Sequence, residues 1–271
     1  MMKKIFLCLI ACLMIVGCGK KEDKNISTMT GKEKLVVAFG GNTTPFSYVK
    51  NAQSEYSVYC SSDQFLEGYD VRVARYLANS LNREIEAKKM TKAAAMEALA
   101  NKEIDLYINA LQTSSLDETV VATNVYYEEG FSIVVLKEGK CAKFKEISKF
   151  KKKTLTSRVD SSAYACISQI EGVKAHEGFA TYEEAFNALK NEEVDGVVVP
   201  TSVANKYAAT DKKLKALSFA QGKGFEGKNQ YVIAMNAELA EGEDSLYQQI
   251  NNAIDHIDDE TSTSWMKEAQ K

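Results

Sequence analysis

The stretch TKAAAMEALANKEID, Thr91–Asp105, recurs ninety residues later as TYEEAFNALKNEEVD, Thr181–Asp195. Seven of the fifteen aligned positions are identical, and no gap is needed. Each copy begins with a threonine that can cap a helix N-terminus, and Thr181 with Glu184 has the spacing of a capping box. Apolar residues at helical spacing follow, and a turn at an asparagine leads into an apolar segment. The repeat therefore predicts two similar helix–strand units.

A helix followed by such a strand is half of a βαβ unit, so two of them indicate two α/β lobes, each with a mainly parallel sheet. The strands of the two repeated units are predicted at residues 104–108 and 194–199, and further strands at residues 35–39, 85–89, 131–136, 154–159 and 230–235. Helices are predicted to begin at Asp70, as an N-terminal cap, and at Ser161 or Ser162. A C-terminal helix is predicted from the apolar stripe of Leu246, Ile250, Ile254 and Ile257.

The N-terminal segment is expected to be removed rather than to fold. Two lysines precede a thirteen-residue apolar run at residues 5–17. A bilayer span needs about 20 apolar residues, so this run is typical of a secretory signal peptide. It ends Ile-Val-Gly-Cys, which resembles the bacterial lipobox, so Cys18 is the expected lipidation site after cleavage of residues 1–17. Residues 18–33 would then be anchor and flexible tether; an ordinary signal peptide with a chance cysteine is the alternative.

Composition and charge give no indication of a nucleic-acid partner. The chain has 34 basic and 37 acidic residues, and loss of the two signal-peptide lysines leaves a net charge of −5. The basic run at residues 143–153 is interpreted as a solvated helix face. The three cysteines beyond the anchor lack CxxC spacing, so we expect no metal and no cofactor. Cys141 and Cys166 can pair, although three unpaired thiols, with Cys60, are the favoured interpretation.

The order of motifs resembles the amino-acid-type family of extracellular solute-binding proteins, family 3, which serve ABC importers. The resemblance runs from Leu35 to the C-terminus, and its segments are Pro45–Tyr48, Gly68–Val71, Ile104–Leu106, Tyr126–Tyr127, Asp160–Ser162 and 193–199. It implies a two-lobed periplasmic-binding-protein type II fold (a venus flytrap) with a two-strand hinge near residues 127–135 and 219–232. Residues 34–127 and 230–271 would form lobe 1, residues 128–229 would form lobe 2, and the ligand would bind between them.

Sites in open α/β sheets lie beyond the carboxyl ends of the strands, which here indicates site loops at residues 40–46, 109–113, 160–162 and 200–202. Applied to this sequence, that rule and the resemblance give a set of candidate ligand-binding residues: Phe46, Tyr69, Asn109, Gln112, Thr113, Arg158, Ser161, Ser162 and Thr201. Arg158 follows a predicted strand and can bind an anionic group beside the two serines and the helix N-terminus. A surface arginine is the equally weighted alternative.

The resemblance fails at the residues by which the family holds an amino acid. The family binds the ligand carboxylate with an arginine, and Leu116 occupies that position here. The family's aspartate for the ligand ammonium is replaced by Pro200, and two aromatic positions hold Thr43 and Lys92. We therefore expect a modified amino acid, a small peptide or another small organic solute. Segment 49–66 is longer than the family's hairpin and is either a surface elaboration or a lid.

The expected function follows from the anchor and the resemblance. The protein would be a lipid-anchored monomer on the extracytoplasmic face of the cell membrane. It would bind a small-molecule ligand and deliver it to an ABC transporter permease. A sensing lipoprotein that reports its ligand to a membrane receptor is the alternative. Catalysis is not expected, because His176 and His256 lie outside the predicted site loops and the sequence has no GxSxG, HExxH or P-loop motif.

Overall fold

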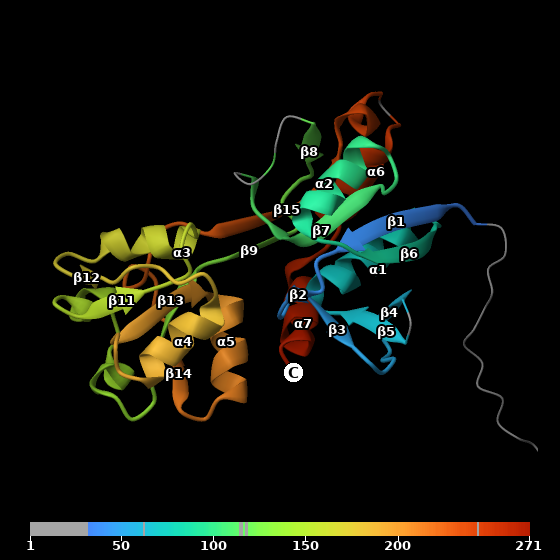
Figure 1. Cartoon of the computed structure of the whole chain (residues 1–271). Helices are drawn as coiled ribbons and strands as arrows, with labels where there is room; N and C mark the ends of the chain where they lie inside the picture. The colour runs from blue at the N-terminus through green and yellow to red at the C-terminus, as the bar shows by residue number, and fades with distance from the viewer. Residues whose placement is uncertain (1–31, 62, 114–115, 117–118, 243) are drawn as a thin grey trace, which may run out of the picture. The chain divides into compact units, whose positions relative to one another are not determined.

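The computed structural model describes residues 32–61, 63–113, 116, 119–242 and 244–271. The predicted signal peptide, Cys18 and most of the predicted tether therefore lie outside the described residues. Residues Lys32–Lys271 form one compact unit, drawn in Figure 1. Within the described part of the chain, a search for a helix of the length and apolarity that a bilayer crossing requires finds none.

The first sheet has six strands in the order β6-β1-β7-β15-β8, with β9 pairing alongside on β15. Its strands are β1 (Lys34–Phe39), β6 (Glu84–Lys89), β7 (Leu106–Leu111), β8 (Val120–Ala122), β9 (Tyr127–Glu129) and β15 (Asn229–Asn236). Strand β1 is parallel to β6 and β7, whereas β15 is antiparallel to its partners. The sheet is therefore mixed, because the strand that comes from the far end of the chain enters in the opposite direction.

Helices cover both faces of this sheet. They are α1 (Tyr69–Ser80), α2 (Lys92–Ala100), α6 (Leu246–Asp255) and α7 (Asp259–Ala269), with the short 3-10 helix η5 (Ala237–Ala240). Successive residues of a strand face opposite sides. Leu106 and Ile108 thus pack in one core with α1, α6 and α7, while Tyr107 packs in the other with α2.

The second sheet has five strands in the order β12-β11-β13-β10-β14. They are β10 (Phe131–Leu136), β11 (Thr154–Thr156), β12 (Lys174–Ala175), β13 (Gly196–Pro200) and β14 (Leu214–Leu217). Its helices are α3 (Ser162–Ala165), α4 (Tyr182–Lys190) and α5 (Thr201–Thr210), with the 3-10 helices η2 (Lys140–Lys143), η3 (Ile147–Phe150) and η4 (Cys166–Gln169). Strand β10 is antiparallel to β13 and β14, so this sheet is mixed as well.

The chain passes between the two sheets along the predicted crossover segments. Strand β9 pairs with the start of β15, with Tyr127 opposite Tyr231 and Glu129 opposite Asn229. One residue after β9, the chain begins β10 of the second sheet. Strand β15 returns the chain to the first sheet. The two sheets are therefore connected by a short antiparallel pair of strands.

Segment 49–66 belongs to a small antiparallel sheet of order β2-β3-β5-β4. Its strands are β2 (Asn42–Thr43), β3 (Ser47–Lys50), β4 (Val58–Ser61) and β5 (Gln64–Glu67). The Tyr56 ring lies 3.7 Å from the guanidinium carbon of Arg72, on α1, and Arg72 in turn forms an ion pair with Glu268 at 3.0 Å. These contacts fix the segment against α1 and the C-terminal helix.

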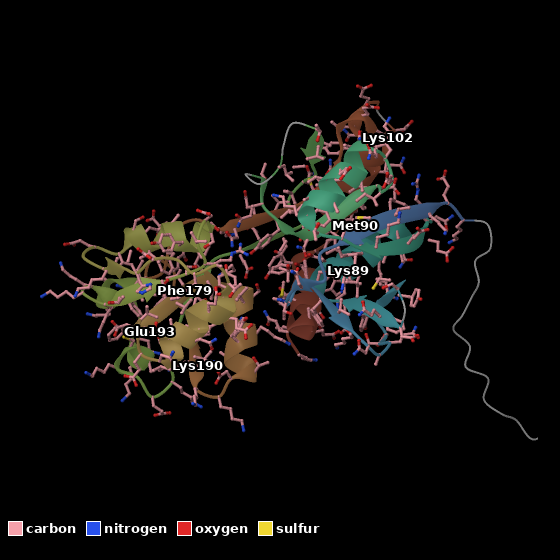
Figure 2. All side chains as sticks on the ribbon, in the orientation of Figure 1. Lys89, Met90, Lys102, Phe179, Lys190 and Glu193 are labelled. Atoms are coloured by element: carbon pink, nitrogen blue, oxygen red, sulfur yellow. The ribbon has the colours of Figure 1, made fainter. Side chains whose placement is uncertain are left out.

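Both copies of the repeat have the predicted helix caps. The Thr91 hydroxyl accepts a hydrogen bond from the backbone amide of Ala94, and Thr181 forms a complete capping box with Glu184. Each helix then ends in a turn, which Figure 2 marks with Lys102 in the first copy and Glu193 in the second. The turn residues have left-handed backbone, with φ of 59° at Lys102 and 60° at residue 192.

Each repeat also ends with an aspartate that joins the helix–strand unit to the first strand of its sheet. Asp105 accepts a hydrogen bond from the backbone amide of Val36, on β1, at 2.8 Å. Asp195 accepts one from the backbone amide of Thr154, on β11, at 2.9 Å. The two aspartates therefore have the same structural role, which is to accept a hydrogen bond from the backbone of the neighbouring strand.

Several predicted details are wrong at the level of single residues. Asp70 does not cap α1, because Gly68 is the N-cap; the Asp70 side chain is fully buried. It accepts hydrogen bonds from the Tyr126 hydroxyl at 2.7 Å and from the Ala110 amide at 3.0 Å. The predicted strand at 154–159 ends at Thr156. The C-terminal stripe is interrupted after α6, so Ile257 lies between two helices.

The three cysteines of the described chain, Cys60, Cys141 and Cys166, are free thiols. Cys141 and Cys166 are buried, and burial raises the pKa of each thiol. Both pack in the core beneath β10 and β11. Cys60 is partly buried on β4, and its sulfur contacts the carbonyl of Gln64 at 3.4 Å. These contacts are those of packed thiols and contain no disulfide bond.

Candidate functional site

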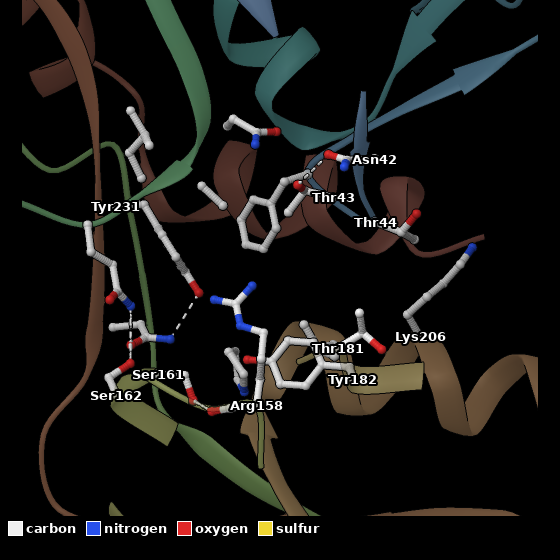
Figure 3. A pocket seen from close by; sticks show the side chains of 18 of the residues that line it. Asn42, Thr43, Thr44, Arg158, Ser161, Ser162, Thr181, Tyr182, Lys206 and Tyr231 are labelled. Carbon is white, nitrogen blue, oxygen red and sulfur yellow. Dashed lines mark hydrogen bonds between the residues drawn. The ribbon is translucent and has the colours of Figure 1, made fainter. Parts of the chain in front are cut away.

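A cavity of about 850 Å³ is lined by residues from both sheets (Figure 3). From the first sheet come the loop after β1, the C-terminal end of β7 and the start of β15. From the second come the turn before α3, the start of α4, the end of β13 and one face of α5. The cavity thus lies where the carboxyl ends of parallel strands were expected to place a site.

Six of the nine predicted ligand-binding residues line this cavity: Phe46, Asn109, Gln112, Arg158, Ser161 and Ser162. They come from three separate segments that the fold brings together. The rule about strand ends therefore located the cavity before any side-chain geometry was known.

The other three predicted residues are not among those that line it. The Tyr69 side chain is fully buried at the start of α1, and its hydroxyl lies 2.7 Å from the hydroxyl of Ser262. Thr113 is exposed at the end of its loop. The Thr201 hydroxyl donates a hydrogen bond to the carbonyl of Gly130 at 3.0 Å, so it holds the start of α5 against β10.

Arg158 points from the second sheet toward the middle of the cavity, near Tyr231 (Figure 3). Its guanidinium lies over the ring of Tyr182, 5.3 Å from the ring centroid. Among the described residues, it has no carboxylate within ion-pair distance. Its own carbonyl accepts a hydrogen bond from Ser161 at 2.6 Å, which fixes the turn below it. The contacts of its carbonyl and of its guanidinium thus fix the position of Arg158, and its positive charge can pair with a ligand.

An amide–hydroxyl group connects elements of the two sheets at one end of the cavity. Gln112 Nε2 donates to Asn229 Oδ1 at 2.7 Å and to Ser162 Oγ at 3.1 Å. Ser162 Oγ also donates to Asn229 Oδ1, as the dashed lines in Figure 3 show. Asn229 is the first residue of β15, so the crossover strand itself takes part in the site.

A buried carboxylate lies behind this group. Glu129 accepts hydrogen bonds from the backbone amide of Ser202 at 2.5 Å, from the Ser202 hydroxyl at 2.8 Å and from the Tyr231 hydroxyl at 3.0 Å. Burial raises the pKa of Glu129, and the donors counteract part of that effect. Tyr231 in turn accepts a hydrogen bond from Asn229 at 3.1 Å. The network therefore joins β9, β15 and the start of α5.

Aromatic rings supply most of the apolar lining. Phe46 packs against Tyr231, with ring centroids 4.9 Å apart, and Tyr107, Tyr182 and Tyr207 complete the set. Burial raises the pKa of Tyr182 to about 12, so this ring stays neutral at physiological pH. Neutral rings beside polar groups suit the apolar body of a small organic ligand.

Asn109 packs closely on Gly40. A side-chain carbon at Gly40 would lie 2.5 Å from Asn109 Nδ2, so a larger residue there would displace the Asn109 side chain. Asn109 Oδ1 is buried without a hydrogen-bond partner in the described part of the chain. A buried amide oxygen without a hydrogen-bond partner is energetically costly. A ligand group that donates a hydrogen bond to Asn109 Oδ1 would remove that cost.

The structure places the four positions at which this chain lacks the family's charged and aromatic ligand-binding residues. Leu116 packs against the core beside α2 and is not among the lining residues. Thr43, Lys92 and Pro200 do line the cavity. Its acidic lining residues are Asp160 and Glu183, which are exposed. A search of the described residues for three grouped His, Cys, Asp or Glu side chains that could hold a metal finds none.

Asn42 and Thr44 line the cavity and lie within residues 40–46, which the strand-end rule indicated, although neither was named as a binding residue. The lining residues that sequence reasoning missed include Tyr107, Thr181, Tyr182, Glu183, Lys206, Tyr207, Asn229 and Tyr231. A signal existed for two of them. Thr181 was recognised as a helix cap, and the residue after a cap at a strand-end loop faces the same edge of the sheet. Lys206 lies on the helix that follows the predicted site loop 200–202. The others depend on side-chain directions that periodicity does not determine.

Two mixed α/β sheets, connected by paired crossover strands and sharing a polar and aromatic cavity, define a two-lobed solute-binding protein. The sequence matches the Bacterial extracellular solute-binding proteins, family 3, over residues 35–268, and the chain belongs to that family. Members of this family bind solutes and are not enzymes. The expected α/β fold class of periplasmic-binding-protein type II is thereby confirmed. The expectation of mainly parallel sheets was wrong, because β10 and β15 each run antiparallel to their partners.

Individual relatives are distant in sequence but similar over nearly the whole chain. The arginine-binding extracellular protein ArtP of Bacillus subtilis (strain 168) is 23% identical over 266 residues, which span 95% of this chain and 94% of that protein. A second relative is a solved structure of an amino acid ABC transporter substrate-binding protein from Streptococcus pneumoniae Canada MDR_19A, bound to L-arginine. It has a TM-score of 0.62 at 20% identity, and the match covers 88% of this chain and 93% of that chain. An ancestral arginine-binding protein bound to glutamine has a TM-score of 0.58 at 24% identity, and the match covers 88% of this chain and 97% of that chain.

Proposed function

We propose that this chain is an extracytoplasmic, lipid-anchored solute-binding protein that captures an amino-acid-like solute and delivers it to an ABC importer. Lobe 1 would comprise residues 34–127 and 230–271, and lobe 2 residues 128–229. The family, and relatives that are named for amino acids, support this proposal. The protein would act as a monomer whose anchor, at Cys18, holds it on the outer face of the cell membrane beside the permease.

The observation that carries the proposal is the Arg158 guanidinium, which points into the cavity with a ring beneath it and no carboxylate partner in the described chain. Arg158 is exposed to solvent within the cavity, so a ligand group of opposite sign can reach its guanidinium. Hydrogen bonds to charged groups are roughly twice as strong as neutral ones. A ligand carboxylate on Arg158, with Ser161 and Ser162 beside it, is therefore the anchor that this geometry supports.

This anchor differs from the one that the family resemblance implies. The family's arginine belongs to the loop after β7, where this chain has Leu116 packed against the core. Here the arginine would come from lobe 2 instead. Because Pro200 supplies no charge for a ligand ammonium, the ligand's other end must be recognised differently. A modified amino acid, a small peptide or another small organic acid fits these residues better than an unmodified amino acid in the usual pose.

The test is calorimetry on purified protein, after a thermal-shift screen of the twenty amino acids, their N-acetyl forms, dipeptides and small carboxylic acids. We expect at least one carboxylate-bearing solute to raise the melting temperature, because a ligand bound only by the folded state stabilises it. Arg158→Gln should then weaken binding by about tenfold or more, since hydrogen bonds to charged groups contribute about 1.5–3 kcal/mol.

Arg83→Gln is the matched control, because Arg83 pairs with Glu33 on the surface and does not line the cavity. Unchanged binding in Arg158→Gln would contradict the proposed anchor. Enzymatic turnover of the bound solute would contradict the proposed transport role.

A further inference from the structure

A second cation faces the same cavity. Lys206, on α5, lines it and is half-buried. Its Nζ donates a hydrogen bond to the backbone carbonyl of Gln270 at 3.2 Å. In the described part of the chain, it forms no ion pair with a carboxylate. A neutral carbonyl satisfies one of the three donors of a lysine and leaves its charge uncompensated.

The surroundings of Lys206 make that end of the cavity positive. Burial and then the charge of Lys50 lower the pKa of Lys206. The nearby carboxylate, Glu67, is already engaged, because it pairs with Lys50 at 3.0 Å and accepts a hydrogen bond from Ser54 at 2.9 Å. An anion placed at Lys206 would relieve the repulsion between the two lysines.

The two uncompensated cations occupy different parts of the cavity. In Figure 3, Arg158 points toward the middle, beside Tyr231, whereas Lys206 extends from α5 toward Thr44. Arg158 comes from the turn before α3 and Lys206 from α5, so the two cations belong to different elements of the cavity wall. Of the charged lining residues, three are basic, with Lys92 as the third, and two are acidic.

We propose that the cavity takes a solute with two anionic groups, one bound by Arg158 and the other by Lys206. This inference rests on the proposed function and names the class of its ligand as a small dicarboxylate or an equivalent dianion. It separates this chain from relatives that are named for arginine, a ligand of opposite charge. Thr44 also lines the cavity and can add a neutral hydrogen bond to a bound anion.

The experiment compares ligands that differ in the second charge. Calorimetry at low and at physiological salt would use L-glutamate against L-glutamine, the dicarboxylates succinate, glutarate and adipate, and L-arginine. We expect at least one dianion to bind about tenfold tighter than L-glutamine and L-arginine, with a preference that shrinks as salt is added, since partly exposed charges are screened. Lys206→Met should reduce that preference to less than about twofold, because only the second contact is lost.

Matched variants separate this inference from the proposed function. Lys212→Met removes the same charge from an exposed residue outside the cavity and should leave the preference intact. Arg158→Gln should weaken binding of every carboxylate. A dianion that needs Arg158 but binds no tighter than L-glutamine, or that keeps its full preference in Lys206→Met, would overturn the two-anion inference and leave the proposed function standing. If no member of the panel binds, both proposals are wrong for solutes of this size.

Discussion

The Arg158 guanidinium lies over the Tyr182 ring, with 5.3 Å between Cζ and the ring centroid. Tyr182 is the first residue of α4 and directly follows Thr181, whose capping box with Glu184 fixes the start of that helix. A local sequence signal thus determines where the ring lies, and the ring orients the arginine. The repeat that defines the fold therefore also positions a residue of the candidate site.

Tyr182→Ala should weaken binding of the carboxylate ligand by about twofold to fivefold, because a cation–π contact at a partly exposed site contributes about 0.5–1 kcal/mol. Tyr182→Phe keeps the ring and should bind within about twofold of the unmodified protein. Calorimetry with the tightest ligand from the carboxylate screen measures both. Equal losses in the two variants would show that the hydroxyl, and not the ring face, is what matters.

Asp195→Ala should lower the free energy of unfolding by about 1–3 kcal/mol, because it leaves the backbone amide of Thr154 without its partner. Asp105→Ala should have a similar effect through Val36. Urea denaturation followed by circular dichroism gives both values. Glu177→Ala, which removes an exposed carboxylate, is the control and should stay within about 0.5 kcal/mol. Losses no larger than the control's would refute the common role of the two aspartates.

Asp70→Asn should stabilise the protein increasingly as pH rises. Burial raises the pKa of Asp70 from 3.8 to about 7. Between those values the folded protein keeps a proton that the unfolded chain has lost, so its free energy of unfolding falls as pH rises from about 4 to about 7. Asparagine has no such proton and escapes the fall. Its Oδ1 can accept from the Ala110 amide while its Nδ2 donates to the Tyr126 hydroxyl, so both contacts can be kept.

The measurement for Asp70→Asn is the difference in melting temperature between variant and unmodified protein at pH 5 and at pH 8. Other titrating groups contribute equally to both proteins and cancel in this difference. We expect the difference to become more favourable to the variant by several degrees at pH 8. A difference that does not change with pH would show that Asp70 is ionised in the folded protein at pH 5 as well.

Cys18→Ala should release the protein from the membrane fraction, because the proposed anchor is attached at that residue. Fractionation followed by immunoblotting measures the distribution, and mass spectrometry of the mature N-terminus identifies the acyl groups. Cys60→Ala is the matched control, since it removes a cysteine from the folded part. Firm membrane attachment of Cys18→Ala would rule out the lipid anchor.

The repeat and the strand pattern predicted most of the fold because their signals are local. A threonine cap, an apolar stripe and a β-branched strand each act within a few residues, and both copies of the repeat form as predicted. Asp70 was misassigned because capping depends on backbone geometry at Gly68, where a side-chain carbon would lie 2.2 Å from the carbonyl oxygen of Phe46. That contact joins segments brought together only by tertiary structure.

The site was predicted in part for a related reason. The rule about strand ends located segments, so it found Arg158 and Gln112, but it does not determine which way each side chain points. Tyr69 was included because it belongs to a recognised motif, yet it is the first residue of a helix whose apolar side faces the core. Tyr231 and Asn229 were missed because the return strand β15 looked purely structural in sequence.

The position of β15, between β7 and β8, determines the order in which the two sheets can be completed. All five strands of the second sheet lie between residues 131 and 217, whereas the first sheet places β15, residues 229–236, between β7 and β8. The second sheet can therefore be completed while the first still lacks an inner strand. Until β15 arrives, β7 and β8 each expose an unpaired edge, and such edges invite pairing with other chains. Release of β15 from the first sheet would thus expose two pairing edges at once, while the second sheet keeps all five of its strands.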